Sequence, residues 1–282
     1  MNTAILEFFG VPVQRRRNVK WLETVRVQRC PYLDRKCLKT RKSQAHIAIG
    51  TCSLSYGKDR KGVVICPHRL LERKQIFTDC LHLLTRHEPG NELHLVGEIS
   101  IPGGSVDYVL ASLKRGKVVD FVGIELQTLD TTGTVWPERQ RLLKQLGLAV
   151  RAQDVSSSKG FGMNWKMTAK TTLVQLHHKV STFEAVNRHL VLVLQDHLMS
   201  YMEHQFSFGH ISSARLGDPM HFHSYELRTE GERFRIVLAR RLSTDTEGIA
   251  ASLGLKADSN VSLKKLINVI QAKISERTRL RF

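Results

Sequence analysis

Two polar side chains, Glu125 and Gln127, interrupt an apolar run that begins at Val118. The run is rich in β-branched and aromatic residues, which predicts a strand, and residues two apart on a strand point to the same face. A carboxylate in such a strand is costly to bury unless something pairs with it. The alternative is a strand end that emerges into water. The spacing therefore predicts a carboxylate and an amide side by side, facing either solvent or a bound partner.

A second acid, Asp107, lies in the preceding predicted strand, residues 103–113. A turn joins the two strands, and its length decides their register. A three-residue loop, 115–117, places Asp107 directly opposite Glu125, whereas a two-residue loop, 115–116, turns Asp107 to the other face. We choose the three-residue loop, because it brings the two carboxylates together at one edge of the sheet.

A third predicted strand, residues 93–101, carries one interior acid, Glu98. Three adjacent strands, each with an acid in an apolar context, are typical of a site for a hard cation. Mg²⁺ prefers a small number of carboxylates and keeps several waters. Such an ion activates water and neutralises charge on a phosphodiester. The acids of these strands are therefore candidate ligands for Mg²⁺.

Four of the five cysteines fall within a basic stretch of the chain, at Cys30, Cys37, Cys52 and Cys66. Their spacing is irregular, so spacing alone leaves open a four-cysteine metal site and ordinary buried thiols. The residues between them are basic with few hydrophobics, so we expect that this stretch cannot build a core and needs a staple, such as a metal held by four thiolates. His46 and His68 are weaker candidate ligands, because four cysteines already complete a structural site. Cys80 lies in a segment with helical spacing and is interpreted as a small core residue.

The composition favours a polyanionic partner. The formal net charge is +17, from 43 Lys and Arg against 26 Asp and Glu, and nucleic acid is the commonest partner of such a chain. A basic surface for solubility or a ribosomal association is the alternative. Membrane-surface binding is disfavoured, because the charge is spread along the chain. No apolar stretch is long enough to span a membrane, and the chain begins without a basic leader or cleavage site, so we expect a cytoplasmic protein.

The pattern of elements predicts an α/β protein in three segments. Residues 1–74 form an N-terminal arm and the four-cysteine region, 75–210 a catalytic core, and 211–282 a C-terminal region that completes the core and could form a dimer interface. The core is expected to contain a helix, three strands, a helix, a strand and a helix, at residues 75–87, 93–127, 171–188, 190–194 and 196–206. The C-terminal region predicts a strand at 234–239 and an amphipathic helix that begins at Ser262.

A long insertion, at about 128–170, directly follows the strand with Glu125. Loops of this length are usually functional, and this one contains a basic helix at residues 137–146. Its basic residues are candidates for guanine or phosphate contacts, with a solvated helix face as the alternative for each; they are Arg139, Arg141 and Lys144.

An Asp on one strand followed by Glu-x-Gln on the next resembles the motif of the PD-(D/E)XK nuclease superfamily. Most members have Lys at the position of Gln127. The local sequence over 97–101, 106–108 and 125–130 is similar to restriction endonucleases of the NotI type, which share the Gln. These enzymes also have an N-terminal four-cysteine iron site with Cys-Pro openings like those at Cys30 and Cys66.

The resemblance, strongest over residues 28–133, implies a PD-(D/E)XK core and a prokaryotic type II restriction endonuclease. Asp107 and Glu125 would hold Mg²⁺, Gln127 would position the water or the metal shell, and Glu98 would be an additional acid. The implied ligands of Fe, or of Zn, are Cys30, Cys37, Cys52 and Cys66.

The implied reaction is cleavage of double-stranded DNA at a GC-rich palindrome, leaving 5′-phosphate and 3′-hydroxyl ends. A palindrome cut in both strands implies a homodimer. Two alternatives remain. One is a metal-containing DNA-binding protein without catalysis, and the other is a repair or phage nuclease with the same core and little sequence preference.

Overall fold

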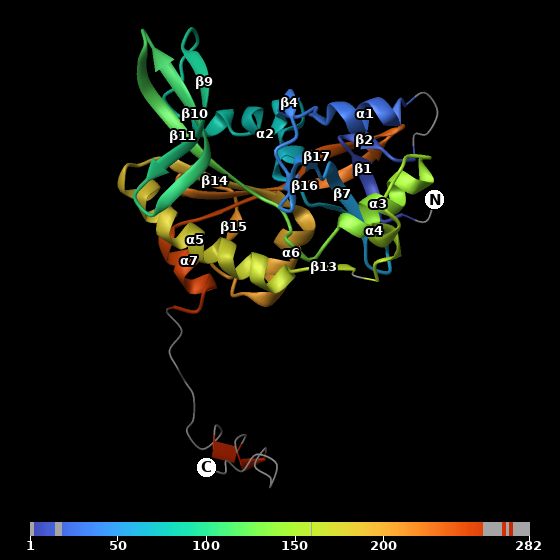
Figure 1. Ribbon diagram of the computed structural model, residues 1–282. Coiled ribbons are helices and arrows are strands. Elements are labelled where there is room, and N and C mark those ends of the chain that lie inside the picture. Colours follow the sequence, from blue (N-terminus) through green and yellow to red (C-terminus); the bar gives the residue numbers. More distant parts are fainter. Residues whose placement is uncertain (1–2, 15–18, 159, 256–266, 269–270, 273–282) are drawn as a thin grey trace.

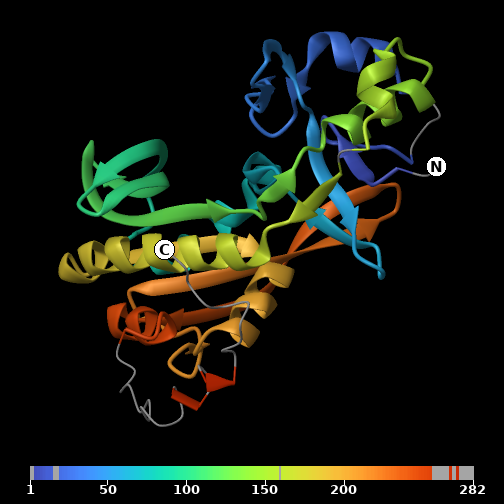
Figure 2. The same cartoon turned by 60° about the horizontal axis from the view of Figure 1, so that its bottom comes forward.

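The structure is a computed structural model that describes residues 3–14, 19–158, 160–255, 267–268 and 271–272. Two lobes lie side by side: a large mixed sheet flanked by helices, and a smaller lobe that holds the amino-terminal strands (Figures 1 and 2). The fold class is α/β, as the sequence predicts. Ser262, where the last helix was expected to begin, lies outside the described residues.

A seven-stranded sheet organises the large lobe. Strands β9, β10 and β11 pair antiparallel, and β11 pairs parallel with β14. Strand β16 runs parallel to β14, and β17 pairs antiparallel with both β16 and β15. In spatial order the strands are β15 (Ser212–Ser213), β17 (Arg233–Thr244), β16 (Met220–Glu230), β14 (His189–Gln195), β11 (Lys117–Gln127), β10 (Gly104–Lys114) and β9 (Glu92–Ile101).

Helical segments cover both faces of this sheet. One face packs against α5 (Trp165–Ala185), α6 (Asp196–Gln205) and α7 (Thr246–Ser252). The other packs against η1 (Pro67–Lys74), α2 (Gln75–Thr78) and η2 (Leu81–Leu83). Strand β14 is buried from both sides, which explains its all-apolar sequence.

The helix predicted over residues 75–87 is replaced by the short segments α2 and η2. The chain turns at Asp79, whose carboxylate accepts hydrogen bonds from Gln75 Nε2 at 2.9 Å and from the Tyr225 hydroxyl at 2.7 Å. The bond from Tyr225 ties the end of α2 to β16. Cys80 is a buried core residue, as predicted.

The smaller lobe is built on a four-stranded antiparallel sheet that the sequence did not predict. Its strands are, in spatial order, β2 (Val11–Pro12), β1 (Ile5–Phe8), β7 (Thr51–Tyr56) and β8 (Lys61–Val64). The expectation that the cysteine-rich stretch cannot build a core is wrong, because Leu54 and Val63 are buried in a core shared with Ile5 and Phe8. Short elements complete the lobe: α1 (Trp21–Val27), β3 (Arg29–Cys30), β4 (Arg35–Lys36), β5 (Thr40–Arg41) and β6 (Gln44–Ala48).

The insertion after β11 packs against the smaller lobe. It leaves and returns through the paired strands β12 (Thr131–Gly133) and β13 (Phe161–Met163), which carry α3 (Trp136–Gln145) and α4 (Ala152–Ser156). Figures 1 and 2 show α3 and α4 beside the amino-terminal strands. In space, therefore, the insertion lies with segment 1–74, while segment 211–282 contributes β15, β16 and β17 to the large sheet.

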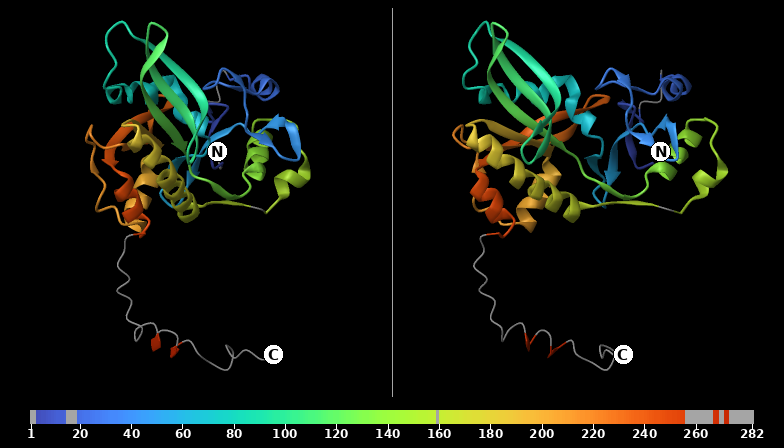
Figure 3. Two further views of the ribbon diagram at one scale, coloured as in Figure 1. Left: turned by 90° about the vertical axis from the view of Figure 1, so that its left-hand side faces the viewer. Right: turned by 60° about the vertical axis from the view of Figure 1, so that its left-hand side comes forward.

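Buried polar contacts join the two lobes, which Figure 3 shows from two further sides. The Gln195 amide, at the end of β14, donates to Gly62 O at 2.6 Å and accepts from Val64 N at 2.9 Å. These bonds hold β8 of the smaller lobe against the large sheet. No helix among the described residues is long and apolar enough to cross a membrane.

Candidate functional site

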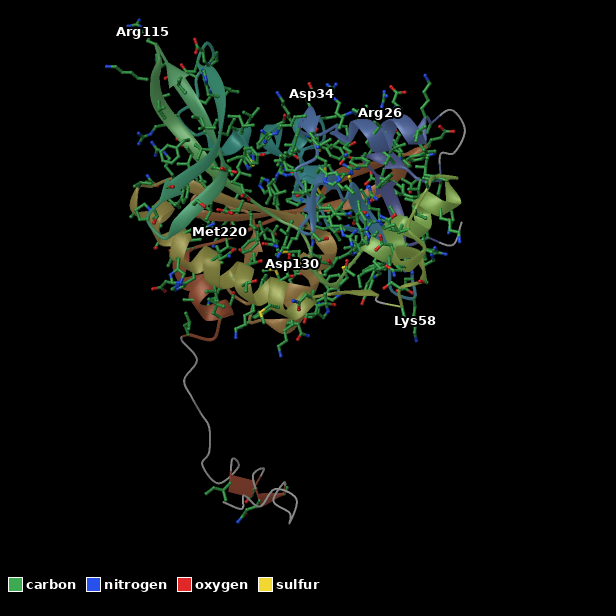
Figure 4. All side chains as sticks on the ribbon, in the orientation of Figure 1. Arg26, Asp34, Lys58, Arg115, Asp130 and Met220 are labelled. Carbon is green, nitrogen blue, oxygen red and sulfur yellow. The ribbon has the colours of Figure 1, made fainter. Side chains whose placement is uncertain are left out.

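The turn between β10 and β11 has two residues, Arg115 and Gly116. Both have positive φ, 53° and 74°, which is the backbone conformation of a type I′ hairpin turn. The predicted three-residue loop is therefore wrong. The turn stands at the tip of an arm formed by β9, β10 and β11, where Figure 4 labels Arg115.

A β-bulge corrects the register before it reaches the acids. The pairing shifts by one residue next to Ser112, so that Tyr108 lies opposite Ile124. The next positions along the two strands are Asp107 and Glu125. The register of the strands up to Tyr108 and Ile124 is therefore the one that the three-residue loop was expected to give, although the loop length was wrong.

Asp107 and Glu98 share a cavity of about 470 Å³. The Asp107 carboxylate accepts a hydrogen bond from Leu126 N at 2.8 Å. This bond links β10 to β11 one residue beyond the last paired position, Tyr108. Glu98 is exposed and has a φ of 54°, a conformation that non-glycine residues adopt rarely. The other lining residues are Arg35, Pro67, His68, Gly97, Tyr108 and Leu126.

Glu125 faces α5 instead of this cavity. Lys179 Nζ donates to Glu125 Oε1 at 2.6 Å, and the two side chains are only 11% and 14% exposed. Burial raises the pKa of Glu125 to about 7, Lys179 acts against this rise, and the carboxylate of Asp107 adds to it. The ion pair with Lys179 therefore offsets only part of the cost of burying the Glu125 carboxylate.

Close packing at the β9–β10 turn brings α5 to the acids. Gly103 has a φ of 88°, and a Cβ there would lie 2.3 Å from His178 O, so only glycine lets the helix approach this closely. A Cβ at Gly104 would lie 3.3 Å from Lys179 Cε. The two glycines thus make room for the helix backbone and for the lysine stem.

Gln127 lies two residues after Glu125 on β11, on the same side of the strand, as predicted. Its Nε2 donates to Thr128 O at 2.7 Å. The amide is therefore held by the adjacent backbone, and it supplies no positive charge to the acids.

All four cysteines predicted as metal ligands are buried in the smaller lobe. Burial raises the pKa values of the Cys30, Cys52 and Cys66 thiols. Neighbouring cysteines raise them further: Cys37 acts on Cys30 and Cys66, and Cys66 acts on Cys52. The four sulfurs therefore belong to one neighbourhood, although they come from distant parts of the sequence.

Backbone N–H groups also point at these sulfurs. Tyr32 and Leu33 bond to Cys30, Gly10 bonds to Cys52, and His68 bonds to Cys66, in each case lowering the thiol pKa. N–H donors favour the thiolate, which is the form that binds metal. Three of the four sulfurs have such support, and a set of four sulfur donors suits Fe or Zn.

Among the residues that the structure describes, no group of three or more His, Cys, Asp or Glu side chains is arranged to hold a metal ion. This holds for the cysteines and for the acids alike. In the described conformation Glu125 is bound to Lys179, and Asp107 is bound to Leu126 N.

The three basic residues expected to contact DNA have different surroundings. Arg139 is buried, and it donates to Ile49 O at 2.9 Å and to Ala48 O at 3.2 Å, so a contact with DNA would require it to leave the interior. Arg141 pairs with Glu138 at 2.5 Å. Lys144 is exposed on the surface of α3.

Sequence reasoning missed two groups near the acids. Lys179 had a signal, because it lies on the buried stripe of α5 with Leu176, Val180 and Phe183 at helical spacing. His68 was considered only as a metal ligand, yet it lines the cavity with Asp107. Burial lowers the pKa of His68, and Arg35 lowers it further.

No protein-family model matches this chain, and no curated protein sequence matches it. The site combines acids on three adjacent strands, a buried lysine and a cavity with a basic wall.

Proposed function

We propose that this protein is a Mg²⁺-dependent endonuclease that cuts both strands of DNA. The sequence resemblance points to a type II restriction endonuclease of the NotI kind, acting on a GC-rich palindrome. The observation that carries the proposal is the position of Asp107 and Glu125 on the adjacent strands β10 and β11, each one residue beyond the pair Tyr108 and Ile124, and near enough for Asp107 to raise the pKa of Glu125. The net charge of +17 supports DNA as the partner.

The order of the elements supports a PD-(D/E)XK core. That core has three strands, then a helix, then a further strand, and β9, β10, β11, α5 and β14 follow this order once the insertion between β11 and α5, which contains β12, α3, α4 and β13, is set aside. The first three strands pair antiparallel and β14 pairs parallel with β11, so α5 is the crossover between two parallel neighbours. Both acids lie on the central strands of this unit.

Each residue has a distinct role in the proposed reaction. Asp107 and Glu125 bind the ion, and Glu98 is an additional acid beside them. A Mg²⁺ held there would activate a water molecule and neutralise charge on the scissile phosphodiester. Gln127 orients the water through Oε1, because its Nε2 is engaged with Thr128 O. Hydrolysis leaves a 5′-phosphate and a 3′-hydroxyl.

The four cysteines supply, in this proposal, a structural Fe or Zn centre. Cys66 is two residues from His68, and Arg35 lies between Cys30 and Cys37, so the centre would fix the basic wall of the cavity. Elemental analysis of the purified protein should find about one Fe or Zn per chain, and Cys37→Ser should lower that content. A protein without either metal would contradict this part of the proposal.

Incubation of the purified protein with a long GC-rich plasmid and Mg²⁺ tests the function. We expect discrete double-strand fragments that carry 5′-phosphates, and no cleavage in EDTA. A smear would favour the nuclease without sequence preference. Binding to DNA without any cleavage would overturn the proposal in favour of the non-catalytic protein.

A cut in both strands of a palindrome needs two active sites related by a two-fold axis. We therefore propose that the protein acts as a homodimer. Light scattering on the complex with a short duplex that contains one cleavage site should give the mass of two chains. A complex of one chain per duplex would contradict the dimer.

A further inference from the structure

Helix α5 carries a buried charge into the site. Of the residues that α5 buries, Lys179 is the charged one. Burying an ammonium group is costly unless a partner compensates it, and here the partner is Glu125 Oε1 at 2.6 Å. Lys179, on the apolar face of α5, thus lies beside the acids that the proposed function requires.

The helix backbone is fixed, while the lysine head is not. Thr182 Oγ1 donates to Pro102 O at 2.8 Å, and His178 O packs against Gly103, so one turn of α5 is held at the β9–β10 turn. The Lys179 ammonium is held by Glu125 at the end of a flexible four-carbon stem. Its head can therefore move by several ångströms without displacing the helix.

We propose that Lys179 is a placeholder cation: it occupies Glu125 in the metal-free protein, yields that carboxylate to a divalent ion, and then donates to a phosphate oxygen of the bound DNA. This inference rests on the proposed nuclease function. Asp107 and Glu125 offer two carboxyl groups near one ammonium, so a divalent ion can compete with Lys179 for Glu125. Gln127 is neutral and bound to Thr128 O, so it cannot provide the positive charge itself.

Binding of Mn²⁺ in the absence of DNA tests the competition without any cleavage. The full-length protein is titrated at pH 8.5, with free Mn²⁺ followed by electron paramagnetic resonance. Lys179→Met and Lys179→Gln remove the competing charge and should bind Mn²⁺ about tenfold more tightly than the wild type. Lys179→Arg keeps the charge and should stay within about twofold. Lys170→Met alters an exposed lysine of the same helix and is the matched control.

Cleavage of DNA at saturating Mn²⁺ tests the second role. Lys179→Met and Lys179→Gln should lower kcat about a hundredfold with little change in KM, and Lys179→Arg should restore part of the loss. A lysine that serves only the structure would not tighten metal binding while it slows cleavage. Thermal melting of each variant identifies any loss of folding, and Lys179→Gln keeps a hydrogen-bond donor for Glu125 if the Met variant unfolds.

The outcomes separate this inference from the proposed function. Charge-removing variants that bind Mn²⁺ no more tightly than the wild type, or that cleave as fast, overturn the role of Lys179. Tighter Mn²⁺ binding in these variants, with no cleavage by any form of the protein, upholds the exchange at Glu125 and overturns both the phosphate contact and the nuclease function. A wild type that binds no Mn²⁺ overturns both proposals.

Discussion

Two buried charge clusters in this molecule differ in how completely their charges are satisfied. Arg69, at the junction of the lobes, is fully buried. Its guanidinium donates to Glu7 at 2.9 Å, to Glu72 at 3.0 Å and to Phe234 O at 2.9 Å. It also lies over the Tyr32 ring, 5.0 Å from the centroid. The donors of Arg69 are thus used in three directions.

In the cluster at Glu125, the ion pair does not fully offset the burial of the carboxylate, in contrast to Glu72. Burial acts to raise the pKa of Glu72, but Arg69, Ile236 N and Arg235 together lower it below its usual value. The pKa of Glu125 is instead raised to about 7, mainly by burial and only partly offset by Lys179. The charges of the first cluster are fully paired, whereas the cost of burying Glu125 is only partly offset, and a bound cation would offset more of it.

Removing Arg69 should have the largest effect on stability. Arg69→Met leaves Glu7 and Glu72 buried without their cation, and we expect the free energy of unfolding to fall by about 3–5 kcal/mol. Urea unfolding followed by circular dichroism measures this loss. Arg228→Met, at an exposed pair with Glu226, is the control and should change stability by less than about 1 kcal/mol. A loss below about 1 kcal/mol for Arg69→Met would contradict the conclusion that Glu7 and Glu72 depend on Arg69 for their stability.

A change at Glu125 should lower the rate of cleavage more than it lowers stability. Glu125→Gln removes a proposed ion ligand, so cleavage should slow about a thousandfold, or about 4 kcal/mol of activation free energy. The free energy of unfolding should fall by about 1–3 kcal/mol, less than for Arg69→Met, because the variant leaves the Lys179 ammonium without its carboxylate partner but also removes a desolvated carboxylate. Parallel cleavage and urea assays measure both, with the exposed Glu23→Gln as the control. A large loss of stability with normal cleavage would make Glu125 a structural residue.

Buried histidines give a third case, in which the buried group stays neutral. His221 and His223 on β16 are buried, and burial lowers their pKa values to about 4 and about 3, with His189 and Arg241 as further causes. The unfolded chain takes up these protons near pH 6.5 and the folded protein does not, so stability is full above pH 6.5 and falls as the pH decreases toward 4. The slope should approach about 2.7 kcal/mol per pH unit for the two groups.

Urea unfolding between pH 7.5 and 4.5 measures that slope. A variant with both His221→Gln and His223→Gln should have a shallower slope, whatever its absolute stability. His204→Gln changes an exposed histidine and should leave the slope unaltered. An unchanged slope in the double variant would mean that other groups cause the acid instability.

An exposed charge should have the smallest effect. Lys144→Ala should weaken DNA binding by less than about 1 kcal/mol and reduce the salt dependence of binding by about one ion. Fluorescence anisotropy with a short duplex, measured over a range of salt concentrations, checks both. Arg139→Met should instead lower stability, because Arg139 bonds to the carbonyls of Ala48 and Ile49 in the interior. A strong salt effect for Arg139 and none for Lys144 would reverse this assignment.

The strands that hold the acids could be predicted from sequence because their patterns are strong and local. Residues 93–127 are rich in β-formers with turn residues between them, and the structure has β9, β10 and β11 there. The loop length could not be predicted, since Arg115 occupies a positive-φ position that sequence assigns to glycine or asparagine. The bulge near Ser112 has no sequence signal of its own, and it restored the register by chance.

The features that could not be predicted from the sequence depend on contacts between segments that are distant along the chain. Strands β1, β7 and β8 have only four, six and four residues, and β7 is rich in small polar residues, so only their shared core shows them to be strands. The burial of Arg139 depends on the amino-terminal strands, which lie far away in sequence. Lys179 lies 54 residues from Glu125, and its place on the apolar stripe of α5 was the one local sign of its role.

Anomalous diffraction from crystals soaked in Mn²⁺ tests whether Asp107 and Glu125 together bind a divalent ion that displaces Lys179. We expect a peak about 2.2 Å from carboxylate oxygens of both Asp107 and Glu125, with Lys179 Nζ displaced from Glu125. A crystal with no peak at these acids, or with Lys179 still bound to Glu125 and the ion elsewhere, would contradict it.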